Sequence, residues 1–247
     1  MKHSEPPVAV ILAAGKGKRM KSDLPKVLQK LHGKPMVEYV INTAKELGVE
    51  RIILVIGHRW EKAKKSLEHL NVEFVVQEQQ LGTGHAVLQT RELLSNFEGD
   101  VLILCGDVPL LRPDTLKQLV NEHRERKAHA TVLTAVFDDP AGYGRVIRGK
   151  SGLVQKIVED KDATAEEREV REINTGTFCF DRASLFSVLE NVRNDNKQGE
   201  YYLTDTFKLL LDQKRPIWAV VASDPSETVG INSEEELERA EEILRAR

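Results

Sequence analysis

A chain of 247 residues with 40% hydrophobic and 30% charged residues has the composition of an ordinary globular protein, and it is long enough to bury a substantial core. Its formal net charge of −3 excludes a whole-protein field that would favour nucleic acid or an anionic membrane, so an anionic substrate needs a local basic patch. No apolar run reaches the roughly 18 residues of a membrane span, and the N-terminus lacks the long apolar stretch of a signal peptide.

The first half of the chain alternates strand and helix signals. Short apolar runs that end in glycine or charged loops are typical of buried parallel strands, and amphipathic stretches separate them. This alternation predicts an α/β fold with a Rossmann-like, mostly parallel sheet. The expected strands are residues 8–13, 52–56, 72–76 and 101–105, and the expected helices are 35–47, 60–70 and 84–95.

The second half is less regular. Strands are expected at 131–137, 177–180 and 217–221, a hairpin within 138–152, and a helix at 202–211. A capping box, Ser233 with Glu236, marks the start of a final helix. We expect a nucleotide-binding lobe over about 1–110, a substrate-binding lobe over about 111–232 and a C-terminal helix over 233–247.

The two cysteines, Cys105 and Cys179, each lie in an apolar, strand-like run. Buried, reduced thiols are therefore expected, and these suit a cytoplasmic protein. No Cys/His cluster has zinc-site spacing.

A basic, glycine-rich segment follows the first strand, from Leu12 to Lys26. Ligands of open α/β sheets bind beyond the carboxyl ends of the strands, and glycines let backbone N–H groups approach phosphate closely. Arg19 can hold phosphate in a bidentate manner, and Lys26 adds a mobile charge. The segment lacks the Gly-Lys-Ser/Thr ending of a P-loop and the third glycine of a dinucleotide fingerprint. We interpret it as a phosphate-binding loop; the alternative is a solvated basic turn.

An apolar strand, residues 101–105, runs directly into Gly106 and Asp107. This places the Asp107 carboxylate at the same sheet edge as the glycine-rich loop. A carboxylate beside a triphosphate needs a cation between them, and Mg²⁺ prefers one or two carboxylates together with phosphate oxygens and water. The alternative is a turn or helix-capping residue before Pro109.

Phosphate and magnesium together favour nucleotidyl transfer to a sugar 1-phosphate. That acceptor is already an anionic nucleophile near neutral pH, so the reaction needs alignment and charge neutralisation but no general base. No Ser/His/Asp or Cys/His set stands out in the sequence, as this mechanism predicts.

The opening segment, Leu12-Ala-Ala-Gly-Lys-Gly-x-Arg-Met followed by Pro25-Lys-Val-Leu28, resembles the N-acetylglucosamine-1-phosphate uridylyltransferase domain of bifunctional bacterial enzymes, a member of the sugar-1-phosphate nucleotidyltransferase family. The resemblance implies transfer of UMP from UTP to N-acetylglucosamine 1-phosphate, giving UDP-N-acetylglucosamine and pyrophosphate, with Mg²⁺ as cofactor and these small molecules as the partners. Further segments match in the same order over nearly the whole chain: Gln80–Ala86, Gly106–Leu110, Gly142–Arg145, Ile157–Ala163, Glu172–Gly176, Gly199–Asp205 and Val229–Asn232.

The resemblance also implies roles for individual residues. Arg19 and Lys26 are expected to act on the nucleotide phosphates as catalytic residues, and Asp107 with Asn232 to coordinate Mg²⁺. The other nucleotide-binding positions are Leu12, Ala13, Ala14 and Gly15 at the phosphates and Gln77, Gly82 and Thr83 at the uracil. His85 is expected to support the turn at Gly82.

Five residues are implied in binding the sugar or its phosphate: Gly144, Glu159, Asn174, Tyr202 and Thr204. Simpler structural alternatives exist for several implied residues. Asn174 is also suited to a turn before Gly176, Gln77 to the end of an edge strand, Asn232 to capping the last helix, and Tyr202 to the core.

Two residues depart from the expected pattern. Lys18 replaces a small hydroxyl residue and Cys105 an aromatic or polar one. The resembling enzymes also continue into a left-handed β-helix that transfers acetyl groups and forms trimers. No hexapeptide repeat follows here, so this sequence is either part of a longer enzyme or that of a monofunctional one; we expect no acetyl transfer from it and consider a monomer plausible. Alternatives for the function are pyrimidine nucleotidyl transfer to N-acetylgalactosamine, glucosamine or N-acetylmuramate 1-phosphate, or a non-catalytic nucleotide-sugar binding module.

Overall fold

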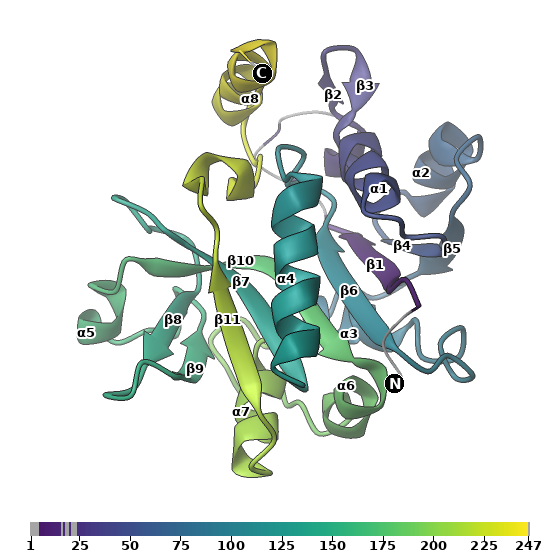
Figure 1. The fold of residues 1–247 in the computed structure, drawn as a ribbon. Helices are drawn as coiled ribbons and strands as arrows, with labels where there is room; N and C mark the ends of the chain where they lie inside the picture. The colour runs from purple at the N-terminus through teal and green to yellow at the C-terminus, as the bar shows by residue number, and fades with distance from the viewer. Residues whose placement is uncertain (1–4, 16, 18–19, 21–23, 247) are drawn as a thin grey trace.

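The structure is a computed structural model that describes every residue except 1–4, 16, 18–19, 21–23 and 247 (Figure 1). Within the described residues, nine strands form one sheet in the order β11-β7-β10-β6-β1-β4-β5, and β8 and β9 extend it beside β10. These strands are β1 (Val8–Ala13), β4 (Ile52–Ile56), β5 (Glu73–Val76), β6 (Asp100–Cys105), β7 (Ala130–Val136), β8 (Arg145–Arg148), β9 (Val154–Val158), β10 (Glu172–Asp181) and β11 (Ile217–Val221).

Along the seven-strand path from β11 to β5, four of the six strand pairs are parallel. β1 pairs in parallel with β4 and β6, β4 with β5, and β11 with β7, whereas β10 runs antiparallel between β6 and β7. The predicted α/β fold with a mostly parallel sheet is confirmed. Leu12 is level with Val55 and Cys105, so the carboxyl ends of β4, β1 and β6 meet at one edge of the sheet. Ligand-binding groups gather at this edge in such folds.

Helices cover both faces of the sheet (Figure 1). Strand β1 is apolar on both faces of the sheet, because Ala9 and Ile11 pack on one face while Val8 and Val10 pack on the other. Both faces therefore need a covering layer of helices. Each fully buried aliphatic side chain of this kind contributes roughly 1.5–3 kcal/mol to folding. One face packs against α1 (Met36–Glu46), α2 (Trp60–Leu67) and α4 (Pro113–Glu125), and the other against α3 (Thr83–Leu88), α6 (Arg182–Leu189) and α7 (Asp205–Asp212).

A third, smaller apolar cluster joins α8 (Glu234–Ala246) to the hairpin of β2 (Lys30–Leu31) and β3 (Lys34–Pro35). The predicted capping box is confirmed: Glu236 N–H donates to Ser233 Oγ over 3.2 Å, and Ser233 N–H donates to Glu236 Oε2 over 3.0 Å. Three short helical segments complete the elements: η2 (Lys26–Leu28), α5 (Ala165–Arg168) and η3 (Pro225–Thr228). No helix among the described residues combines the length and apolarity needed to cross a bilayer.

Some expected elements differ from the observed ones. The helix expected over 84–95 ends at Leu88, because the Thr90 hydroxyl and N–H both bond back to Val87 O and form a turn. The helix expected from Tyr202 begins at Asp205, since Thr83 Oγ1 accepts the Leu203 N–H and holds this segment against α3. The hairpin expected within 138–152 is formed by β8 and β9, which form an antiparallel pair and extend to Val158. The helices α4 and α6 were not among the expected elements.

Candidate active site

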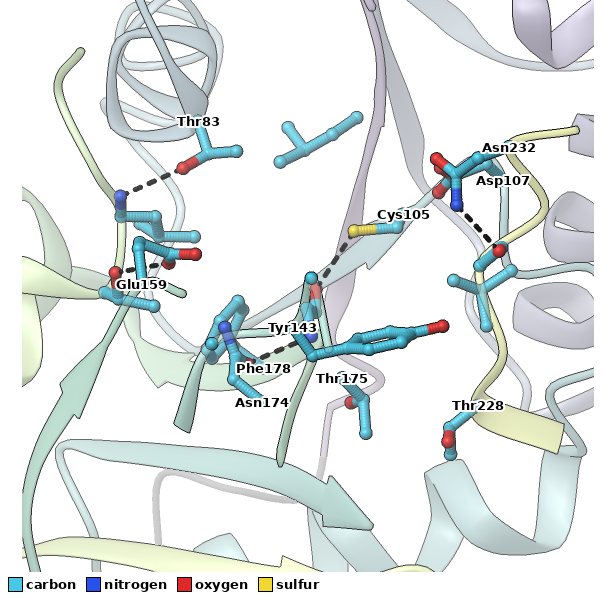
Figure 2. A pocket seen from close by; sticks show the side chains of 18 of the residues that line it. Thr83, Cys105, Asp107, Tyr143, Glu159, Asn174, Thr175, Phe178, Thr228 and Asn232 are labelled. Carbon is cyan, nitrogen blue, oxygen red and sulfur yellow. Dashed lines mark hydrogen bonds between the residues drawn. The ribbon is translucent and has the colours of Figure 1, made fainter. Parts of the chain in front are cut away.

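Two pockets adjoin at the carboxyl edge of the parallel strands. One has a volume of about 310 Å³ and the other about 520 Å³. Both are lined by Leu12, Thr83, Cys105 and Asp107, so these residues mark the boundary between them. In the smaller pocket, Asp107 and Asn232 lie at one end, Thr83 and Glu159 at the other, and Cys105 between them (Figure 2).

The larger pocket collects the residues expected to bind the nucleotide. Gly17 shows why this segment needs glycine: its φ is +58°, and a Cβ there would lie only 2.7 Å from the Cβ of Lys26. Arg19 and Lys18 lie outside the described residues. The expected residues that line this pocket are Leu12, Ala13, Ala14, Gly15, Lys26, Gln77, Gly82 and Thr83.

Lys26 connects the two residues expected to bind the metal. Its ammonium donates to Asp107 Oδ2 and, over 2.6 Å, to Asn232 Oδ1. The Asn232 amide is fixed in this orientation because its Nδ2 donates to Gly230 O over 2.8 Å. A carboxylate oxygen and an amide oxygen therefore converge on one cationic group. Both are hard oxygen donors, so this pair fits a Mg²⁺ ion that takes its remaining ligands from phosphate and water.

The segment that carries Asn232 is held to the end of β6 by buried hydrogen bonds. Ile231 N–H donates to Asp107 O over 2.8 Å. The fully buried Glu227 carboxylate accepts from Arg112 N–H at 3.0 Å and from the Thr115 hydroxyl at 2.7 Å. Asn232 does not cap α8, because Ser233 does so.

The smaller pocket contains four of the five residues expected to bind the sugar: Gly144, Glu159, Asn174 and Thr204. The Thr204 hydroxyl donates to Glu159 Oε1 over 2.9 Å, and burial raises the pKa of the Glu159 carboxyl. A Cβ at Gly144 would approach Glu159 Oε2 to 3.3 Å, so glycine keeps this wall open. Asn174 lies within strand β10, just before a register shift rather than in a separate turn, and its Oδ1 accepts Gly176 N–H over 3.0 Å.

Tyr202, the fifth residue, lines neither pocket. Its side chain is buried, and its hydroxyl donates to Asp162 Oδ2 and accepts from Gln198 Nε2. The structural alternative, that Tyr202 belongs to the protein interior, describes its surroundings better than a place in the pocket wall.

Cys105 lies where the pockets meet. Its thiol donates to Gly176 O over 3.4 Å, and a Cβ at Gly176 would come within 2.7 Å of the sulfur. Burial raises the pKa of the Cys105 thiol to about 12, so the group stays protonated and is a poor nucleophile. Both cysteines are free, as expected.

Several lining residues were not singled out by the sequence. Tyr143 and Gly142 fall within one of the matching segments, which was the available signal. Thr175 and Gly230 in the smaller pocket and Gln80 and Glu200 in the larger one also fall within matching segments, and Glu236 belongs to the predicted capping box. Ala141, Phe178 and Thr228 carry only local turn or strand signals.

Asp205, at the start of α7, gives a prediction about stability. Burial and the nearby carboxylates of Asp195 and Asp162 raise its pKa from 3.8 to about 6. The folded state thus holds a proton that the unfolded state releases, and stability falls as the pH rises from about 4 to about 6. We expect Asp205→Asn to be more stable than the parent by roughly 2 kcal/mol at pH 7 and equal to it at pH 4. Urea unfolding at both pH values measures this, and an equal gain at both would contradict it.

A mostly parallel sheet whose first strand leads into a glycine-rich segment, with Lys26 beside a carboxylate and an amide oxygen, defines an α/β enzyme that handles nucleoside phosphates. Residues 9–208 match the family model described as the MobA-like NTP transferase domain. The chain therefore belongs to this nucleotidyltransferase family.

Curated relatives agree with this assignment. The "Bifunctional protein GlmU" of Bacillus velezensis is 49% identical over 239 residues, which cover 97% of this chain and 52% of that protein. The proteins of the same name from Bacillus subtilis and Listeria monocytogenes are each 48% identical with the same coverage. The chain thus spans about half the length of the curated relatives it matches.

A solved structure shares the fold. The crystal structure of UDP-glucose pyrophosphorylase complexed with UDP-glucose matches with a TM-score of 0.76 and 20% identity, covering 98% of this chain and 99% of that one.

Proposed function

We propose that this chain catalyses the Mg²⁺-dependent transfer of UMP from UTP to N-acetylglucosamine 1-phosphate, releasing pyrophosphate. The observation that carries the proposal is the pair of adjoining pockets that share Asp107. One has a glycine-rich wall with Lys26, suited to a nucleoside triphosphate, and the other has carboxylate and amide groups suited to sugar hydroxyls. The 48–49% identity to GlmU proteins supports the same reaction.

In this proposal the nucleotide occupies the larger pocket. Backbone groups of Ala13, Ala14 and Gly15 contact the phosphates, together with Lys26 and Arg19. Gln77, Gly82 and Thr83 face the base. Residues before about 110 thus supply the nucleotide lobe.

The sugar phosphate occupies the smaller pocket, where Glu159 and Asn174 bind hydroxyl groups. Thr204 holds Glu159 through its hydrogen bond. The buried Glu159 carboxyl accepts a hydrogen bond from a sugar hydroxyl, and its raised pKa reflects the cost of leaving that charge without such donors. Residues from about 111 to 232 thus supply the sugar lobe.

The chemistry requires alignment rather than a base. The acceptor phosphate oxygen attacks the α-phosphate in line, and a P–O bond to pyrophosphate breaks. Lys26 and Arg19 neutralise charge on the departing phosphates. Asp107 and Asn232 would hold Mg²⁺, which supplies further neutralisation at the phosphate oxygens when bound.

A substrate panel tests this proposal. We expect the purified protein with Mg²⁺ to release pyrophosphate from UTP and N-acetylglucosamine 1-phosphate with the highest kcat/KM of any pair. The panel crosses UTP, dTTP and CTP with the 1-phosphates of N-acetylglucosamine, N-acetylgalactosamine, glucosamine, N-acetylmuramate and glucose. Pyrophosphate release is followed by a coupled assay, with EDTA as the metal-free control.

Each outcome has a defined meaning. Fast turnover of a different sugar phosphate would overturn the acceptor assignment, and fast turnover of CTP would overturn the nucleotide assignment. Binding of a UDP-sugar without any pyrophosphate exchange would overturn catalysis and favour a binding module.

A further inference from the structure

Two hydrogen bonds fix the amide nitrogen of the Gln77 side chain. Its Nε2 lies 3.0 Å from Gly82 O and 3.0 Å from His85 Nδ1. The Gln77 backbone is also fixed, because its N–H donates to Ile56 O over 2.7 Å and its carbonyl accepts from Gln80 Nε2 over 2.8 Å. The side chain lines the larger pocket although it is only 3% exposed.

These contacts determine which amide atom is which. A carbonyl oxygen can only accept, so the amide atom facing Gly82 O must be the nitrogen. An amide nitrogen carries two protons, and Gly82 O and His85 Nδ1 take one each. The remaining hydrogen-bonding capacity of the Gln77 amide is that of Oε1, which is an acceptor.

The second bond requires a particular form of His85. Its Nδ1 accepts a proton from Gln77 only if the ring is neutral and carries its own proton on Nε2. In that form His85 Nε2 faces a second donor, Gln89 Nε2, at 3.2 Å. Gln89 is half-buried and already donates to His85 O over 3.1 Å, so its side chain can shift, whereas the almost fully buried Gln77 amide would be left with an unused donor. Burial lowers the pKa of His85, which keeps the ring in this form near neutral pH. His85 lies on α3, one turn after Gly82, and it lines neither pocket.

An acceptor at this place discriminates between pyrimidines. Uracil and thymine present an N3–H donor, whereas cytosine presents a lone pair at N3, which would face the Gln77 oxygen without a proton between them. Turning the amide over to suit cytosine would lose both bonds from Nε2 and set a carbonyl against a carbonyl.

We propose that His85 is a positioning residue that sets the preference for uridine and thymidine nucleotides over cytidine nucleotides by locking Gln77 as a hydrogen-bond acceptor. The proposal rests on the proposed function only in that the base lies against Gln77. It assigns His85 a role beyond supporting the turn at Gly82.

The test compares His85→Leu, which removes the acceptor, with His85→Asn, whose Oδ1 can replace Nδ1. Calorimetry measures UMP and CMP binding to the free protein, and kcat and KM are measured with UTP and CTP. We expect His85→Leu to lower the preference for uridine over cytidine nucleotides roughly tenfold, which is the effect of losing one hydrogen bond. The change should come from a higher KM for UTP, with little change in kcat. His85→Asn should retain most of the preference.

Controls separate this role from a structural one. His69→Leu makes the same substitution at an exposed position and should leave the preference unchanged. In a Gln77→Ala background, His85→Leu should have no further effect on the preference. Thermal melts show whether each variant is folded.

The results distinguish this proposal from the proposed function. A parent protein that binds UMP and CMP equally would overturn both. If the parent prefers UMP, two results would overturn the role of His85 alone. The preference could be unchanged in His85→Leu, or His85→Leu could lower it by the same factor in the parent and in the Gln77→Ala background.

Discussion

Replacing Asp107 with alanine should lower kcat/KM for pyrophosphate release by roughly 10³-fold or more while the protein remains folded. Asp107 supplies the only carboxylate of the Lys26, Asp107 and Asn232 set, and its side chain is partly exposed, so its loss leaves no core cavity. Removing it leaves the amide oxygen of Asn232 to hold a divalent ion alone and weakens charge neutralisation at the phosphates. A loss of this size corresponds to about 4 kcal/mol of transition-state stabilisation.

The control for this variant is Asp114→Ala, which removes an exposed carboxylate a few residues further along the chain. It should retain parental activity and the same Mg²⁺ requirement. Circular dichroism and thermal melts establish that both variants are folded. If Asp107→Ala kept a Mg²⁺-dependent rate near that of the parent, the assignment of the metal site would be wrong.

The central strands could be predicted because they are buried on both faces. β1, β4 and β6 are continuous apolar runs that end at glycine or charge, and this pattern leaves little choice of structure. The reversal of β10 could not be read in the same way. Its apolar residues, such as Phe178 and Phe180, predict a strand, but whether that strand runs parallel or antiparallel depends on connections far away in the chain.

The two helices that were not expected, α4 and α6, differ in how strong their sequence signals are. α4 carries usable signals, with Pro113 in its first turn and Leu116, Leu119 and Val120 at helical spacing. α6 carries a weaker one, because residues on most sides of this short helix are buried and the polar and apolar faces are poorly separated.

Within the candidate site, the sequence was most informative where a strand ended. Gly106 and Asp107 had to lie at the carboxyl edge because β6 carries them there. Asn232 lies 125 positions after Asp107, and its local pattern indicates only a helix start, so the resemblance alone brought it to the site. The same resemblance placed Tyr202 in the pocket wall, where a matching segment could not reveal that its side chain is turned toward Asp162.

Glu227 is the residue whose importance the sequence did not reveal. Its fully buried carboxylate accepts hydrogen bonds from Arg112 N–H, the Arg112 guanidinium at 3.3 Å and the Thr115 hydroxyl at 2.7 Å. It therefore ties η3 to the start of α4, which follows Asp107. The segment that carries Asn232 begins directly after η3.

Replacing Glu227 with alanine should lower the free energy of unfolding by about 3 kcal/mol, because it leaves buried donors without an acceptor and opens a cavity. For a chain of this size, that loss lowers Tm by roughly 6–12 °C. Urea unfolding and calorimetry measure both quantities. Asn232 should also lose its fixed position against Lys26, so below the new Tm the variant should bind Mn²⁺ together with UTP more weakly than the parent.

Two further variants make this result specific. Glu227→Gln keeps the shape and one acceptor oxygen but turns an amide N–H₂ toward other donors, so its loss should be intermediate. Glu238→Ala removes an exposed carboxylate from α8 and should change stability by less than about 0.5 kcal/mol. If Glu227→Ala were as stable as Glu238→Ala, the buried carboxylate would not be what holds η3 to α4. A large stability loss with unchanged Mn²⁺ binding would show that Asn232 keeps its position without Glu227.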